Sequence, residues 1–226
     1  MSSRLRVSVV LPWLLLLWMS LIIWAAFFYA PAAAGFQGQS SRIVFFHVPT
    51  AWVATLAFLV SCIASIRYLR TRDVKDDIRA ETASSLGLLF AVLATVTGSI
   101  FARIMWGSFW NWDPRETSIT FLLLIYAAYF ALRAAVADPE RRATLAAVYS
   151  ILAFVTVPFL VFVVPRIYWS LHPDTIINTQ AKIKMDSRMF QVLMGSLAGF
   201  TGLAAWLYTI RCRVESIRRR RQQEVL

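Results

Sequence analysis

The chain has 226 residues, of which 59% are hydrophobic, and it carries 9 Trp, 16 Phe and a formal net charge of +11. A soluble domain of this size would not tolerate so much apolar side chain. Composition therefore excludes a soluble enzyme or binding module and indicates a polytopic membrane protein.

Six apolar runs follow one another along the chain, and each of about 20 residues can cross roughly 30 Å of hydrocarbon as a helix. They predict an all-α fold with six transmembrane helices in a single integral membrane domain, residues 1–226. The predicted elements are helices at about 7–29, 45–66, 84–104, 118–137, 143–165 and 189–210, a Trp-rich loop at 105–117 and a basic tail at 211–226.

The first run has flanks, SSRLR and YAPAAAG, that resemble those of a cleaved signal peptide. The apolar core of such a peptide usually has about 7 to 15 residues, and this run is clearly longer. We therefore expect it to remain as the first helix.

The basic residues predict the orientation of the helices. When the connections alternate between the two sides, most of the 23 Lys and Arg fall with the two chain ends, Arg4, Arg6 and the RRRR of the tail among them. The other side receives fewer, including Lys182 and Lys184. We expect both termini in the cytoplasm. Attraction to membrane lipid headgroups explains part of the charge, and nucleic-acid binding by the tail is the weaker interpretation.

The chain has only two histidines, and both flank predicted extracytoplasmic connections. His47 lies in RIVFFHVPT near the start of the second run, and His172 lies in YWSLHPDT after the fifth. The connection between these two holds the stretch MWGSFWNWDPRET. The topology therefore predicts that both histidines and the Trp-rich loop share one face of the membrane.

Trp106, Trp110 and Trp112 have two possible explanations. Tryptophans near helix ends often form the interfacial aromatic belt. However, a belt requires neither this density nor Gly107, which would leave room beside the indoles. A broad apolar surface for a flat, conjugated ligand would use both features.

Asp113 has a structural explanation in the sequence DPRE. An Asp can cap the following helix, Pro114 fits its first turn, and Glu116 stands three residues after the cap, as in a capping box. This role is compatible with shaping a ligand site.

The two histidines indicate metal ligands. A pair of neutral imidazoles on opposite sides of a planar aromatic ligand describes the axial coordination of haem iron. Zinc is disfavoured because no Cys, Asp or Glu set of suitable spacing joins them. Pro49 and Pro173 follow the histidines closely and would hold them at helix boundaries.

Cys62 and Cys212 form neither a CxxC pair nor a CxxCH attachment site. Haem would therefore be held without a thioether bond, which suits a carrier better than a cytochrome.

The stretch WGSFWNWDPRET resembles the tryptophan-rich signature, WGxxWxWD, of the haem-handling proteins of cytochrome c maturation. SSRIVFFHVPTAW, TVTGSIFARIMWG and YWSLH extend the resemblance over about residues 38–210. Chain length and helix number are similar to the haem exporter protein C (CcmC) branch. DPRE is closer to the CcsA-type haem lyase subunits, but these would carry a second histidine pair, for which this chain has no histidine left.

The resemblance implies a haem carrier, not an enzyme, that holds haem b at the extracytoplasmic surface, with iron coordinated by His47 and His172. The residues it implies around the porphyrin are Trp106, Gly107, Trp110, Trp112, Asp113, Arg115 and Trp169. The propionates need cationic or hydrogen-bonding partners, for which Arg42, Arg103, Arg115, Arg166 and Arg188 are candidates.

The resemblance also implies a location in the bacterial cytoplasmic (inner) membrane, with the haem site facing the periplasm. The implied partners are the periplasmic haem chaperone CcmE, the small membrane protein CcmD and the ABC transporter CcmA/CcmB. Three alternatives stay open: a CcsA-type subunit of a cytochrome c haem lyase, a membrane transporter of another solute, and a structural subunit whose aromatics are only a belt. A transporter is disfavoured because the apolar runs hold few ionisable residues and show no repeat.

Overall fold

A computed structural model describes residues 3–34, 37–172 and 185–224, so that Pro173, Lys182 and Lys184 lie outside the described ranges. Within those ranges all regular secondary structure is helical, which confirms the all-α prediction. Six helical segments are long and apolar enough to cross a membrane, as the apolar runs predicted.

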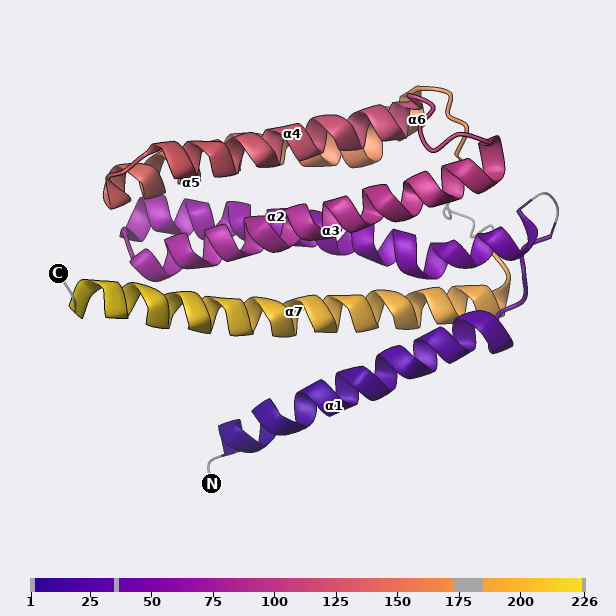
Figure 1. The fold of residues 1–226 in the computed structure, drawn as a ribbon, viewed down its shortest axis with the longest axis horizontal. Coiled ribbons are helices and arrows are strands. Elements are labelled where there is room, and N and C mark those ends of the chain that lie inside the picture. The colour runs from indigo at the N-terminus through magenta and orange to yellow at the C-terminus, as the bar shows by residue number, and fades with distance from the viewer. Residues whose placement is uncertain (1–2, 35–36, 173–184, 225–226) are drawn as a thin grey trace.

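The elements are α1 (Ser3–Trp24), a π-helical turn η1 (Ala25–Tyr29), a 3-10 turn η2 (Gly38–Ile43), α2 (Val44–Thr71), α3 (Val74–Trp106), α4 (Pro114–Ala135), α5 (Pro139–Pro158), a second π-helical turn η3 (Phe159–Val163), α6 (Val164–Ile167) and α7 (Ser187–Glu224). Helix α2 packs on α3, α5 and α7, α4 packs on α5, and α1 leans against α7 at the edge (Figure 1).

Three connections meet at one end of this bundle. The η1–η2 segment, the α3–α4 loop and α6 lie there, whereas the first residues of α1, the last residues of α7 and the two short turns α2–α3 and α4–α5 lie at the opposite end (Figure 1). The residues before α2, after α3 and after α6 are thereby brought to one end of the molecule.

Several helices continue beyond the apolar runs at the end that holds the termini. Asp73 caps α3 by accepting a hydrogen bond from the Lys75 N–H at 2.9 Å, so that α3 starts well before its apolar run. The segment expected as a basic tail continues α7 as a helix to Glu224. Arg219 of this extension pairs with Asp77 at 2.8 Å and Glu81 at 2.7 Å on α3, and Arg133 of α4 pairs with the same two carboxylates.

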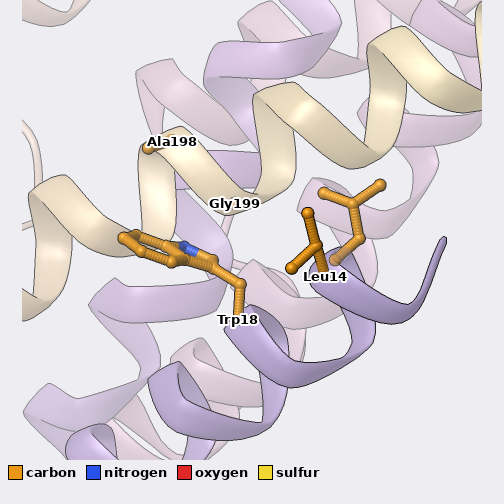
Figure 2. Close-up of a pocket in the computed structure, with 5 residues that line it drawn as sticks. Leu14, Trp18, Ala198 and Gly199 are labelled. Atoms are coloured by element: carbon orange, nitrogen blue, oxygen red, sulfur yellow. The ribbon is translucent and has the colours of Figure 1, made fainter. Parts of the chain in front are cut away.

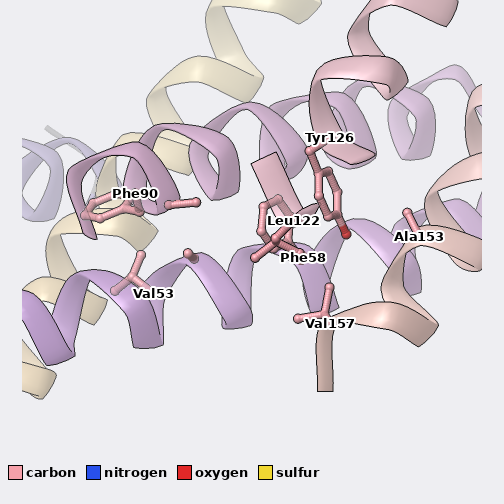
Figure 3. Packing of buried hydrophobic residues seen from close by; sticks show 9 residues of the cluster. Val53, Phe58, Phe90, Leu122, Tyr126, Ala153 and Val157 are labelled. Carbon is pink, nitrogen blue, oxygen red and sulfur yellow. The ribbon is translucent and has the colours of Figure 1, made fainter. Parts of the chain in front are cut away.

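A buried apolar cluster holds the middle of the bundle together. The Phe58 ring of α2 stacks on the Tyr126 ring of α4 with centroids 3.5 Å apart, and Leu122, Ala153 and Val157 surround the pair (Figure 3). Gly87 of α3 faces this cluster, because a Cβ there would collide with the Phe58 ring. Small residues of this kind let membrane helices approach closely.

Pro158 ends the regular part of α5, and the π-helical turn η3 follows it directly. A proline inside a spanning helix removes one backbone hydrogen bond, and local π adjustments compensate. The chain therefore changes helix type at this proline, between α5 and α6.

An open apolar groove lies between α1 and α7. Leu14, Leu15 and Trp18 line it from α1, and Ala198 and Gly199 line it from α7 (Figure 2). The Trp18 indole N–H donates to the Gly195 carbonyl at 2.9 Å. This groove lies within two membrane-spanning helices and does not include either histidine.

Candidate functional site

The Trp-rich loop starts where α3 ends. Gly107 adopts a left-handed φ of 80° and its N–H donates to the Arg103 carbonyl at 3.1 Å, closing the helix. Nothing lies within 4 Å of the position that a Cβ of Gly107 would occupy. The left-handed turn explains a glycine at this position, and the open space at its Cβ position is compatible with the room beside the indoles that the sequence predicts.

The capping box predicted from DPRE is confirmed. The Asp113 carboxylate accepts from the Arg115 N–H at 2.9 Å, and the Glu116 carboxylate accepts from the Asn111 and Asp113 N–H groups at 2.7 and 3.3 Å. Pro114 occupies the first turn of α4. The cap fixes the backbone on both sides of Trp112, which itself has a positive φ of 55°.

The same Asp113 carboxylate anchors the segment that carries His172. It accepts hydrogen bonds from the Ser170 hydroxyl at 2.9 Å and the Leu171 N–H at 2.7 Å, and its Oδ1 lies 3.2 Å from Nδ1 of His172. The Asp113 side chain is 1% exposed. The sequence showed the cap but not this second role, because Asp113 and Ser170 come from distant parts of the chain.

The surroundings of Asp113 and His172 determine the charge of each side chain. Burial alone would raise the pKa of Asp113, but hydrogen bonds from Arg115, Leu171 and Ser170 and the nearby His172 outweigh it, so that the pKa lies below its ordinary value. Burial, with help from the Arg115 charge, lowers the pKa of His172 in spite of the opposing effect of Asp113. At neutral pH, His172 is therefore a neutral imidazole beside a carboxylate, the form that binds metal.

His47 approaches from α2. Its Nδ1 lies 3.0 Å from the Thr97 hydroxyl of α3, and the backbone of Gly98 passes beside its ring. His47 lies in the first turn of α2, at the end of the bundle where the segment that carries His172 also lies. The fold therefore brings both histidines to one end of the bundle.

The tryptophans differ in how they lie relative to His172. The Trp106 ring lies 5.1 Å from the His172 ring and 5.7 Å from Phe101, centroid to centroid. Trp110 and Trp112 meet edge to face, with planes 88° apart, so these two indoles do not form one flat surface. Trp112 and Trp169 are 70% and 81% exposed, which leaves large apolar surfaces beside the histidines' end of the bundle.

The five arginines considered for the propionates are in different situations. Arg42 donates to the carbonyls of Ala26 and Ala30 at the end of η1, and Arg166 donates to the Phe162 carbonyl at 2.6 Å. Arg103 donates to the Gly107 carbonyl, and Arg188 lies 6.0 Å from the Tyr29 ring centre. Arg115 is the arginine whose charge acts on both His47 and His172.

The donor set is sparse. Among the described residues, no three His, Cys, Asp or Glu side chains gather as a metal-binding group. Haem iron needs fewer ligands from the protein, because the porphyrin occupies four coordination positions and only the axial positions remain for side chains.

Comparison with known proteins gives one family. The sequence model of the family described as Heme exporter protein C matches residues 2–226. Heme exporter protein C of Bradyrhizobium diazoefficiens is 35% identical over 93% of this chain and 80% of the relative. The protein of that name from Rhodobacter capsulatus is 32% identical over 88% of this chain and 81% of the relative. A ccmC-like mitochondrial protein of cytochrome c biosynthesis from Marchantia polymorpha is 32% identical over 74% of this chain and 71% of the relative.

Proposed function

The chain belongs to the Heme exporter protein C family of cytochrome c biogenesis, and from this we propose that it binds haem b between His47 and His172 and delivers it to a CcmE-like periplasmic chaperone. It is a multi-pass membrane protein that carries haem as its cargo. Haem supplies the iron and the porphyrin, while the chain supplies axial ligands and a surface at the membrane edge.

The arrangement of Asp113, His172 and Trp106 carries this proposal. Nδ1 of His172 faces a charged carboxylate at 3.2 Å, so the ring donates its proton there and presents an unprotonated Nε2. A carboxylate behind a ligating histidine fixes the tautomer and raises ligand basicity. Trp106 packs on the same ring at 5.1 Å and limits its rotation.

The aromatic and cationic residues provide contacts for the porphyrin and its propionates. The exposed faces of Trp112 and Trp169 offer apolar surface for the porphyrin, and Trp110 supports Trp112 from its edge. Arg115 serves a propionate, since its charge acts on both histidines. Gly107 sets the direction in which the loop leaves α3.

The chain's own contribution to transfer is positional. By the distribution of Lys and Arg, the end of the bundle that holds the histidines faces the periplasm. Haem held there in a fixed orientation meets the chaperone at high effective concentration. CcmD and the CcmA/CcmB transporter are the further partners that the family implies for this step.

The test is the visible spectrum of the detergent-purified protein after haem is supplied. Wild type should give a low-spin, bis-histidine spectrum, and His47→Ala or His172→Ala should lose it or become high-spin. Trp106→Leu should weaken haem binding, whereas Trp13→Leu, at a tryptophan that is 69% exposed on α1, should not. Spectra of free haem in detergent for all these proteins would refute the proposal.

A haem lyase would behave differently. It would join haem to a CxxCH peptide without a separate chaperone. The carrier proposed here should transfer haem to the chaperone and leave such a peptide unmodified.

A further inference from the structure

Thr97 and Gly98, two neighbours on α3, form the immediate surroundings of the His47 ring. The Thr97 hydroxyl lies 3.0 Å from Nδ1 of His47. A Cβ at Gly98 would stand 3.0 Å from Cε1 of the same ring, closer than ordinary van der Waals contact. The His47 ring therefore has both a hydrogen-bonding partner and a close backbone neighbour on α3.

The hydroxyl of Thr97 has a single proton, and the helix already uses it. Its oxygen lies 2.8 Å from the Leu93 carbonyl and 3.1 Å from the Ala94 carbonyl, the usual acceptors of a threonine in a helix. When the hydroxyl donates to one of these carbonyls, its oxygen can only accept at His47, and the proton between the two side chains then belongs to the imidazole. In that arrangement Nδ1 of His47 carries the proton and Nε2 carries the lone pair.

From these contacts we propose that Thr97 and Gly98 are positioning residues for haem ligation, which hold His47 in the tautomer and orientation that present Nε2 to the iron. The proposal rests on the proposed function, in which His47 is an axial ligand. Thr97 sets the tautomer, and Gly98 lets the α3 backbone lie against the ring and restrict its rotation.

The two axial ligands are consequently supported by different chemistry. Nδ1 of His172 faces the charged carboxylate of Asp113, and Nδ1 of His47 faces a neutral hydroxyl. A carboxylate makes the imidazole a stronger electron donor than a hydroxyl does. Loss of the Thr97 hydroxyl should therefore act mainly through the tautomer and orientation of His47.

The first experiment uses the haem-free protein, because the chain holds only two histidines. Full-length protein labelled with ¹⁵N-histidine, purified with a tag that contains no histidine, gives two ring spin systems, assigned with His47→Gln. Both rings should be protonated at Nδ1 and unprotonated at Nε2. Thr97→Val should change the His47 signals alone, and Thr97→Ser should restore them.

Thr95 provides a matched control on the same helix. Its hydroxyl donates to the Ala91 carbonyl at 2.8 Å, as Thr97 does four residues back, so Thr95→Val removes the same kind of helix contact away from the histidine. Thr95→Val should leave both histidines unchanged. A His47 ring protonated at Nε2 in wild type, or identical spectra for Thr97→Val and Thr95→Val, would overturn the proposal.

The second experiment uses haem-loaded protein. Thr97→Val and Gly98→Ala should shift the low-spin ferric EPR signal and the midpoint potential, and weaken haem binding by roughly 10- to 100-fold, the usual effect of losing a partner of a metal-ligating histidine. Thr97→Ser and Thr95→Val should match wild type. If wild type itself shows no bis-histidine species, the proposed function fails. If wild type shows it and Thr97→Val equals Thr95→Val, only the positioning role fails.

Discussion

The carboxylate of Asp113 lies 3.2 Å from Nδ1 of His172, although 59 positions separate the two residues in the chain. The same side chain caps α4 through the Arg115 N–H. One buried carboxylate therefore joins the start of a membrane helix to the ring of a proposed haem ligand, and a substitution at Asp113 can separate these two roles.

Asp113→Asn should keep the cap and impair the histidine. Asn and Asp are nearly equal as N-caps, so the cap itself should remain. An amide has one acceptor oxygen, so its NH2 group would face the Leu171 N–H, and haem binding should fall roughly 10- to 100-fold because the segment loses this anchor and an amide cannot hold the Nδ1 proton as a carboxylate does. Asp113→Ala should lose both the cap of α4 and the hydrogen bond to His172, and the lost cap should reduce stability by about 0.5 to 2 kcal/mol. Thermal unfolding and haem titration measure the two effects separately.

Asp138 is the control for this pair of substitutions. It caps α5 at the opposite end of the bundle and accepts from the Arg141 N–H at 2.7 Å. Asp138→Ala should reduce stability to a similar degree and leave haem binding intact. A large loss of haem binding in Asp138→Ala would show that capping alone explains Asp113.

The titration of His172 should report its burial and the charge of Arg115. Both lower its pKa below the ordinary 6.5, so the neutral, ligand-competent ring is fully present above 6.5 and is lost only as pH falls through the lower folded value. Arg115→Gln removes one lowering influence and should move the midpoint up toward 6.5. Arg166→Gln, whose guanidinium donates to the Phe162 carbonyl, should not move it. NMR of the ¹⁵N-histidine protein measures each midpoint, and a wild-type value above 6.5 would contradict this account.

Gly87→Ala should destabilise the bundle by about 1 to 3 kcal/mol, as overpacking of a filled core does. The new methyl group would collide with the Phe58 ring, which is fully buried and stacked on Tyr126. Thermal unfolding in detergent measures the loss.

Two further variants test whether Phe58 is the cause. Gly87→Ala combined with Phe58→Leu should be less destabilised than the sum of the two single changes, because the smaller side chain removes the collision. Gly202→Ala on α7 meets only the flexible end of Leu15 at 3.2 Å and should be close to neutral. Strict additivity of Gly87→Ala and Phe58→Leu would exclude a direct contact between them.

Arg219→Gln should loosen the last turns of α7. This guanidinium joins α7 to Asp77 and Glu81 of α3 while its side chain is 20% exposed, so its loss should cost about 2 kcal/mol, within the range for hydrogen bonds to charged groups. Hydrogen exchange should rise in residues 211–224. The exposed neighbour Arg220 is the control, and Arg220→Gln should leave exchange unchanged. Equal exchange in both variants would mean that the ion pairs do not hold this helix end.

The features predictable from the sequence were those that a short stretch determines by itself. The six membrane helices follow from apolar runs, because the hydrocarbon core requires about 20 such residues in succession. The cap at Asp113 follows from DPRE, since all its partners lie within one turn. Both predictions needed no knowledge of how the helices pack.

Helix ends and long-range contacts were not predictable in this way. Hydropathy marks where a helix meets lipid, not where its hydrogen bonds end, so it did not indicate that α3 begins at Val74 or that α7 continues to Glu224. The sequence around Thr97 does not indicate its role, because it has the pattern of an ordinary apolar helix. Its contact with His47 depends on the register of α3 against α2, which local sequence does not encode.

The orientation of the bundle can be tested by cysteine labelling in whole cells. Phe109 in the Trp-rich loop is 58% exposed, and Ala137 is exposed in the α4–α5 turn at the other end of the bundle. Because most Lys and Arg gather at the end that holds Ala137, the positive-inside rule puts Phe109 in the periplasm. In a Cys62→Ala, Cys212→Ser background, a membrane-impermeant maleimide should label Phe109→Cys in intact cells. Ala137→Cys should react only after the membrane is opened. The reverse pattern would put both histidines on the cytoplasmic side, where a periplasmic chaperone could not take haem from them.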